Sequence, residues 1–216
     1  MTFSICVREE TDDGTVFGVA VATDAPAVGA LAPCISHEGV ISTQSFVNVR
    51  LGRRGIELLS DLAVSDALAG LLARDSHSDL RQVHGLDYRG VAFAHSGEEC
   101  DGWFGHEVHE EAGITAAGNM LANDQTLSAA VDAYRSTEGR VGERLVAALE
   151  AGKETGGDKR GHTSAALKVK APETTIYHDL RVDEHETPVA ELRRVYEAAR
   201  EASEQFTEAK KSRIFD

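Results

Sequence analysis

The chain has 216 residues, 42% of them hydrophobic, which is enough for one globular domain with a sizeable core. Acidic residues outnumber basic ones by 36 to 22, and the formal net charge of -14 argues against a nucleic-acid-binding surface. Only six of the 22 basic residues are lysines, a composition typical of cytoplasmic proteins of salt-loving microbes, whose anionic surfaces are screened by high salt.

The first part of the chain predicts strands before any helix. Residues 3–8 and 15–23 are apolar and β-branched, and the acidic, turn-forming segment between them predicts a hairpin. A third apolar run, residues 39–46, reads as another strand. Three strands therefore open the fold.

A pair of helices and further strands are expected next. Leucine and alanine recur at helical spacing over residues 51–72, with Ser65 as the expected cap of the second helix. Residues 82–87 and 90–95 predict a second tight hairpin, and residues 113–117 predict one more strand.

The last third predicts two helices, at residues 125–135 and 141–151, then a glycine-rich turn and a strand at residues 163–169. Runs of strands that alternate with paired helices favour the α+β class, with two stacked antiparallel sheets covered by helices.

We assign residues 1–182 to one domain and residues 183–216 to a charged C-terminal helix and tail that dock on it. The helix carries an apolar stripe made of Val189, Leu192, Val195 and Tyr196. The polar end of the chain reads as a frayed tail.

Thr2 is the first candidate for chemistry, because it follows Met1 directly and opens the first strand. Aminopeptidases that remove the initiator methionine generally accept a small second residue. Thr2 would then carry a free α-amine, which titrates near ~7.7–8 and can act as general base for the neighbouring hydroxyl.

Polar residues at strand ends are the expected partners of Thr2. Asp24 ends the second strand, where its carboxylate would orient the amine or hydroxyl, or would simply belong to a turn. Thr43 and Gln44 are candidates for binding a substrate amide, or are solvent-facing strand residues. Asn119 is a candidate oxyanion donor, with a cap or turn as the alternative.

The remaining candidates are weaker. Asp158 and Arg160 lie in the glycine-rich turn, which lacks phosphate-loop spacing, and would face a pocket or pair with each other. His106 and His109 form an H-x-x-H without a third ligand fixed by spacing, and on a strand they would face opposite sides. We therefore expect no metal and no cofactor, and at most a pocket role for His106.

Cysteine usage and hydropathy predict a reduced, cytoplasmic protein with no membrane contact. Cys6, Cys34 and Cys100 show no C-x-x-C spacing, and the sequence shows no secretory signal or long apolar span. Cys6 and Cys34 read as small buried hydrophobes.

Several ordered segments resemble the domain-of-unknown-function family 1028, and together they span nearly the whole chain. They are MTFSI at 1–5, GVAVATDAPAVGA at 18–30, STQSF at 42–46, GRRGIELL at 52–59, GNML at 118–121, GGDKRGHTSAALKV at 156–169 and TPVAELRR at 187–194.

The resemblance implies the N-terminal nucleophile hydrolase superfamily and its four-layer αββα sandwich. Members of that superfamily cleave amide bonds with an N-terminal Thr, Ser or Cys, which matches Thr2. Asp24 resembles the Asp that ends the second strand in proteasome-like members. Their Lys on the next strand has no counterpart in residues 39–46.

Two functions follow as expectations. The first is hydrolysis of a small-molecule amide or peptide-like bond through Thr2. The alternative is a non-catalytic binding protein or oligomeric scaffold on the same fold, in which a homo-oligomer forms and Thr2 is an ordinary residue.

Overall fold

The computed structural model describes residues 2–156, 161–172 and 178–205. Its six-stranded sheet has the order β10-β9-β2-β1-β8-β7 and its four-stranded sheet the order β3-β4-β5-β6, with antiparallel pairing throughout. The strands are β1 (Thr2–Thr11), β2 (Gly14–Thr23), β3 (Pro33–Ile35), β4 (Gly39–Ser45), β5 (Arg81–Asp87), β6 (Ala92–Ser96), β7 (Trp103–His109), β8 (Ile114–Leu121), β9 (Ser164–Lys170) and β10 (Asp179–Val182). The described α-helices are α1 (Val28–Leu31), α2 (Val49–Leu58), α3 (Val64–Leu72), α4 (Gln125–Ser136), α5 (Val141–Glu154) and α6 (Pro188–Glu204). The expected α+β class is confirmed.

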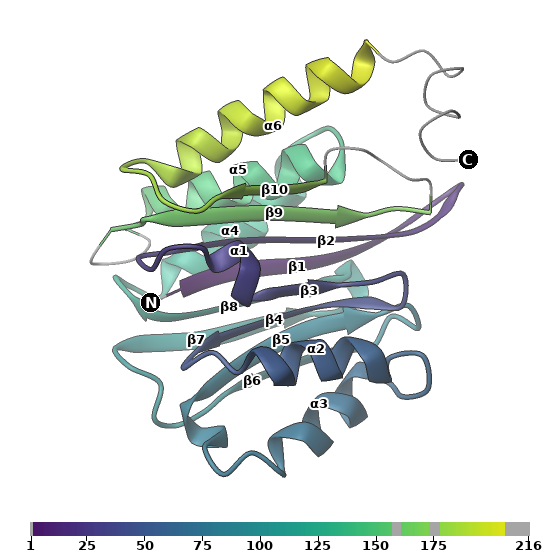
Figure 1. Ribbon diagram of the computed structural model, residues 1–216, viewed down its shortest axis with the longest axis vertical. Coiled ribbons are helices and arrows are strands. Elements are labelled where there is room, and N and C mark those ends of the chain that lie inside the picture. Colours follow the sequence, from purple (N-terminus) through teal and green to yellow (C-terminus); the bar gives the residue numbers. More distant parts are fainter. Residues whose placement is uncertain (1, 157–160, 173–177, 206–216) are drawn as a thin grey trace.

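The two sheets face each other, and helices pack on their outer faces (Figure 1). Helices α4 and α5 pack on the six-stranded sheet, and α2 and α3 pack on the four-stranded sheet. Strands β1 and β8 lie against β4 and β5 across the space between the sheets. Side chains at the centre are therefore shielded from solvent on both sides.

Successive side chains of β1 point alternately into the helix-covered core and into the space between the two sheets. Phe3, Ile5 and Val7 belong to the core cluster that includes the leucines of α4 and α5. Ser4 and Cys6 point the other way, toward the four-stranded sheet, because successive strand residues face opposite sides. Polar residues at even positions of β1 thus enter the space between the sheets.

Helix α6 lies across α5, β9 and β10 (Figure 1). It begins at Pro188, and Val189, Leu192 and Tyr196 are buried in the same core cluster as α5. Full burial of such a side chain stabilises the fold by roughly 1.5–3 kcal/mol. Arg193 of α6 adds ion pairs to Glu143 and Glu150 of α5.

Several sequence predictions need correction. Ser65 does not cap α3, which begins at Val64; the Val64 amide donates instead to the Asp87 carboxylate at 2.8 Å. Strands β3, β7 and β10 were not predicted. Two of them, β3 and β10, have only three and four residues, and β7 is a partly exposed edge strand with no clear apolar alternation.

The described helices include none that is both long and apolar enough to cross a bilayer. Cys6 is a buried free thiol, as expected, and Cys100 is buried as well. Cys34 differs from the expectation, because it is only partly buried and lines a cavity at the edge of β3.

Candidate functional site

The space between the sheets is apolar at one end and polar at the other. At the apolar end, Cys6, Phe17, Val19, Val40 and Leu86 form one buried cluster. At the other end, next to the start of β1, the facing side chains are hydroxyls, amides and an imidazole that are almost fully buried. They are Ser4, Gln44, Gln82, His84, Thr115 and Asn119, which we call the buried polar network, and the neighbouring hydroxyl pair of Thr2 and Thr23.

Thr2 lies at the end of β1 that borders this network. Its backbone is in register with Thr23 of β2 on one side and Asn119 of β8 on the other. The Thr2 and Thr23 hydroxyls share a hydrogen bond of 3.0 Å, and Thr2 is 7% exposed. The hydroxyl is therefore held in one orientation close to the surface.

Gln82 is the centre of the network and joins both sheets. Its Oε1 accepts from Gln44 Nε2 at 2.8 Å and from Asn119 Nδ2 at 3.0 Å. Its Nε2 donates to Ser96 Oγ at 2.7 Å and lies 2.9 Å from the Gly118 carbonyl oxygen. These bonds fix the side-chain amide of Asn119 beside Thr2.

A second branch runs through Ser4 and His84. Ser4 donates to Gln44 Oε1 at 2.7 Å, so that it accepts from His84 Nε2 at 2.8 Å, and His84 Nδ1 then accepts from the Thr115 hydroxyl at 2.9 Å. Burial, and next the nearby His106, lower the pKa of His84 to about 3. The imidazole is neutral and donates to Ser4, so this Ser-His pair does not have the proton arrangement of a nucleophile and its base.

His106 is at the outer end of the network. The Ser96 hydroxyl, which accepts from Gln82, shares a hydrogen bond of 3.0 Å with His106 Nδ1. Partial burial, and next the neighbouring His95, lower the pKa of His106 and keep it neutral. His106 thus connects the buried amides with the solvent-exposed edge at β7.

The H-x-x-H pair lies on strand β7, and its two rings have different partners. His106 bonds Ser96, whereas His109 lies 2.9 Å from a carboxylate oxygen of Glu107. Within the described ranges, no group of three or more His, Cys, Asp or Glu side chains is placed to hold a metal ion.

Two residues of the site have strained backbones. Ser45 and Met120 have positive φ angles of 68° and 54°, and they directly follow Gln44 and Asn119. A left-handed conformation at a non-glycine residue costs on the order of 1–3 kcal/mol and is concentrated at functional sites. Both amides are thus presented at the ends of their strands by unusual local geometry.

The structure brings together some of the predicted site residues and separates others. Gln44, Asn119 and His106 are joined through the network that borders Thr2. Asp24 follows Thr23, and its Oδ1 accepts from Thr163 at 3.1 Å.

Thr43 lies on the opposite face of β4, against Gly52 of α2, and its buried hydroxyl has no hydrogen-bond partner among the described residues. It points away from the network because it precedes Gln44 by one position. Asp158 and Arg160 lie outside the described residues.

Sequence reasoning missed Ser4, Gln82, His84 and Thr115. A signal was present in β5, where Gln82 and His84 alternate with the apolar Val83 inside a strand that is otherwise buried. Polar residues at every second position of such a strand indicate a polar layer on one face. Which strand lies opposite that face depends on the tertiary structure.

Comparisons with known proteins identify the family of the chain and a solved structure with a similar fold. The profile of the family described as "Family of unknown function (DUF1028)" matches residues 2–192. The crystal structure of protein SPO2555 from Silicibacter pomeroyi, from the same family, superposes with a TM-score of 0.83 at 28% sequence identity, covering 92% of this chain and 85% of that one. Among proteins with curated descriptions, none matches the chain.

Proposed function

The chain belongs to the DUF1028 family of unknown function, and we propose that it is an N-terminal nucleophile hydrolase that cleaves a small amide or peptide-like bond. In this proposal Thr2 becomes the first residue when Met1 is removed, and its hydroxyl is the nucleophile. The layer order of helices, sheet, sheet and helices supports the proposal, because it is the order of the four-layer αββα sandwich of that superfamily.

The observation that carries the proposal is the position of Thr2 in the fold. Thr2 is the first residue of β1, and its backbone pairs with Asn119 of β8. Its side chain borders the polar end of the space between the sheets. An α-amine on this residue would lie beside its own hydroxyl, which is the arrangement in which a single residue supplies both nucleophile and base.

The reaction follows from these positions. Thr2 Oγ attacks the substrate carbonyl carbon, and the α-amine accepts the hydroxyl proton. The resulting oxyanion is stabilised by Asn119 Nδ2, which carries two hydrogens and donates only one of them to Gln82. Collapse of the intermediate breaks the C–N bond, and the ammonium group returns the proton to the leaving amine.

Hydrolysis of the ester that remains on Thr2 completes the cycle. Water adds to the ester carbonyl while the α-amine takes its proton, and the acid product leaves as the Thr2 hydroxyl is restored. Thr23 positions Thr2 Oγ through the 3.0 Å contact, and it is the donor of this bond while Oγ carries the acyl group. Gln82 acts as a positioning residue, because its Oε1 accepts from Asn119 Nδ2, and Gln44 donates to the same Oε1.

The chemistry of the network favours an uncharged amide as substrate. The side chains bonded around Asn119 and Gln44 are amides, hydroxyls and the neutral His84. An ionised group would lose hydration there without gaining a charged partner from the network.

A direct test compares wild type with Thr2→Ala and Thr2→Ser on a panel of small amides, lactams and short peptides at high salt. We expect turnover by wild type, retention of part of it by Thr2→Ser, and loss of at least about a hundredfold in Thr2→Ala, the scale expected for removal of a nucleophile. Equal turnover by Thr2→Ala, with an unchanged fold, would instead favour a binding or scaffold protein.

A further inference from the structure

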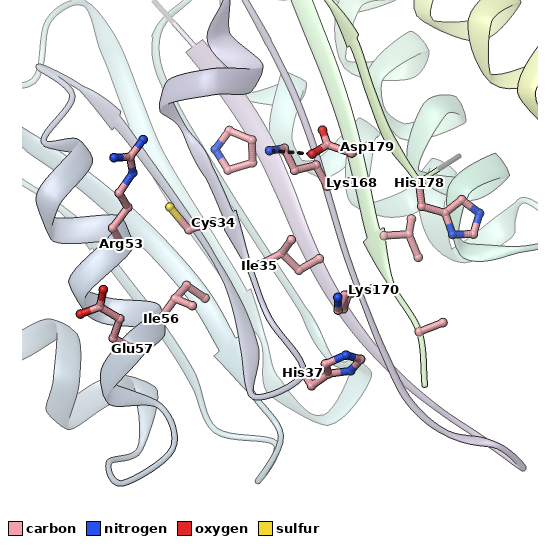
Figure 2. A pocket seen from close by; sticks show the side chains of 13 residues that line it. Cys34, Ile35, His37, Arg53, Ile56, Glu57, Lys168, Lys170, His178 and Asp179 are labelled. Atoms are coloured by element: carbon pink, nitrogen blue, oxygen red, sulfur yellow. Dashed lines mark ion pairs between the residues drawn. The ribbon is translucent and has the colours of Figure 1, made fainter. Parts of the chain in front are cut away.

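A cavity lies at the edge of the molecule opposite the β7 edge, where β3 and α2 face β9 and the start of β10. Its volume is about 640 Å³, within the ~300–1,000 Å³ typical of small-molecule sites. Figure 2 shows side chains from both sheets pointing into it.

The cavity is separate from the Thr2 site. Ser164 is the residue of β9 that pairs with Thr23, whereas Lys168 pairs with Val19, four residues further along the strand. At ~3.4 Å per residue this places Lys168 about 14 Å from the level of Thr2.

The lining combines apolar side chains with positive charge. Ile35 and Ile56 supply the apolar surface. Arg53 of α2 lies on one side of Cys34, and Lys168 and Lys170 of β9 lie on the other (Figure 2). Two of the six lysines of a chain with a net charge of -14 are thus gathered in one cavity.

The acidic residues of the lining do not neutralise these cations fully. Asp179 pairs with Lys168 at 3.3 Å, and Glu57 pairs with Arg54, outside the cavity, at 2.8 Å. Over the part of the chain that the structure describes, Arg53 and Lys170 form no ion pair. Arg53 and Lys170 are therefore two cations without an ion-pair partner among the described residues, in a cavity that Glu57 also lines.

Cys34 lies within the electrostatic influence of cations from both walls of the cavity. Burial raises the pKa of its thiol, while the charges of Lys168 and then Arg53 act in the opposite direction. Both cations are thus close enough to the sulfur to influence its ionisation, although they come from opposite walls. A negative group placed near Cys34 would be attracted by both.

We propose that this cavity binds a small organic oxyanion, with its carboxylate or phosphate group between Arg53 and the β9 lysines and its apolar body against Ile35 and Ile56. The planar guanidinium of Arg53 is suited to bidentate contact with either group. The partly apolar lining selects for an organic ligand over a bare inorganic ion. This inference is independent of the chemistry at Thr2.

The test uses benzoate and phenyl phosphate as probes, with benzamide as the uncharged analogue, and follows the isoleucine methyl signals of the full-length protein by NMR. We expect at least one of the two anions to shift the methyl signals of Ile35 and Ile56. The methyl signals of Ile5 and Ile114, in the distant core, should not change. The anion that binds should have a Kd at least about tenfold below that of benzamide.

Variants on the same helix provide a matched control. Arg53→Gln should raise the Kd of the bound anion roughly tenfold, the effect of losing one charge-assisted hydrogen bond. Arg50→Gln removes the same charge from an exposed position of α2 outside the cavity lining and should leave the Kd within about twofold. The proposal is overturned if benzamide binds as well as the anions, if neither anion moves the Ile35 and Ile56 methyls, or if both variants weaken binding equally.

Discussion

Replacing Gln82 with methionine perturbs the buried polar network at its centre. Gln82 is fully buried and bonds side chains of β4 and β6 in its own sheet, and a side chain and backbone carbonyls of the facing sheet. Methionine keeps the length of the side chain but offers neither a strong donor nor a strong acceptor. The substitution therefore removes the partners of Gln44 and Asn119 together.

The magnitude follows from the groups left unpaired. A buried donor or acceptor that loses its partner costs ~1–3 kcal/mol, and Gln44 Nε2 and Asn119 Nδ2 both lose the Oε1 acceptor. Allowing for relaxation, we expect Gln82→Met to lower the free energy of unfolding by about 3–5 kcal/mol.

Urea unfolding followed by circular dichroism measures this loss. Gln125→Met is the control, because Gln125 is exposed at the start of α4 and its substitution should change stability by no more than ~0.5 kcal/mol. The reasoning is refuted if Gln82→Met is within about 1 kcal/mol of this control at an unchanged urea dependence.

Three further predictions concern pH, packing and salt. His84 has a pKa of about 3 in the folded protein against ~6.5 unfolded, so the unfolded state binds the proton first and stability falls as pH drops below 6.5. Between pH 7 and 5 this lowers the free energy of unfolding by an amount on the order of 2 kcal/mol. Urea unfolding should show that the stability of His84→Gln changes by that much less than that of wild type over the same range. An unchanged pH dependence would contradict a buried neutral imidazole. Leu192→Ala, in the buried face of α6, should lower the free energy of unfolding by about 2–4 kcal/mol in the same assay. The control Leu62→Ala, at a side chain that is 40% exposed, should lower it by less than about 1 kcal/mol. Equal losses would mean that α6 is not packed as described. Raising NaCl from 0.1 to 2 M should raise the melting temperature, because salt screens a net charge of -14, and a lowered value would argue against that origin.

Much of the secondary structure could be predicted, because local patterns determine it. The β1-β2 hairpin, the β5-β6 hairpin and the helices α4 and α5 match runs whose apolar period is clear in the sequence. The cap of α3 could not be found in this way, since Asp87, which receives the Val64 amide, is 23 positions away in the sequence. Such a long-range bond leaves no local pattern.

The site was only partly predictable for the same reason. Asn119 and Gln44 were selected as polar residues at strand ends, but the residue that links them, Gln82, becomes visible only when the two sheets are placed face to face. Thr43 and Gln44 were treated alike, although strand alternation requires that one of the two face the helices. Applying this rule to β4 would have separated them.

The central claim, that Thr2 is an N-terminal nucleophile, is tested most directly by mass spectrometry of the N-terminal peptide before and after treatment with a β-lactone that acylates reactive hydroxyls. The account predicts a native protein that lacks Met1 and a single adduct on Thr2, absent from the Thr2→Ala variant. A native protein that retains Met1, or an adduct of equal yield in Thr2→Ala, would contradict it.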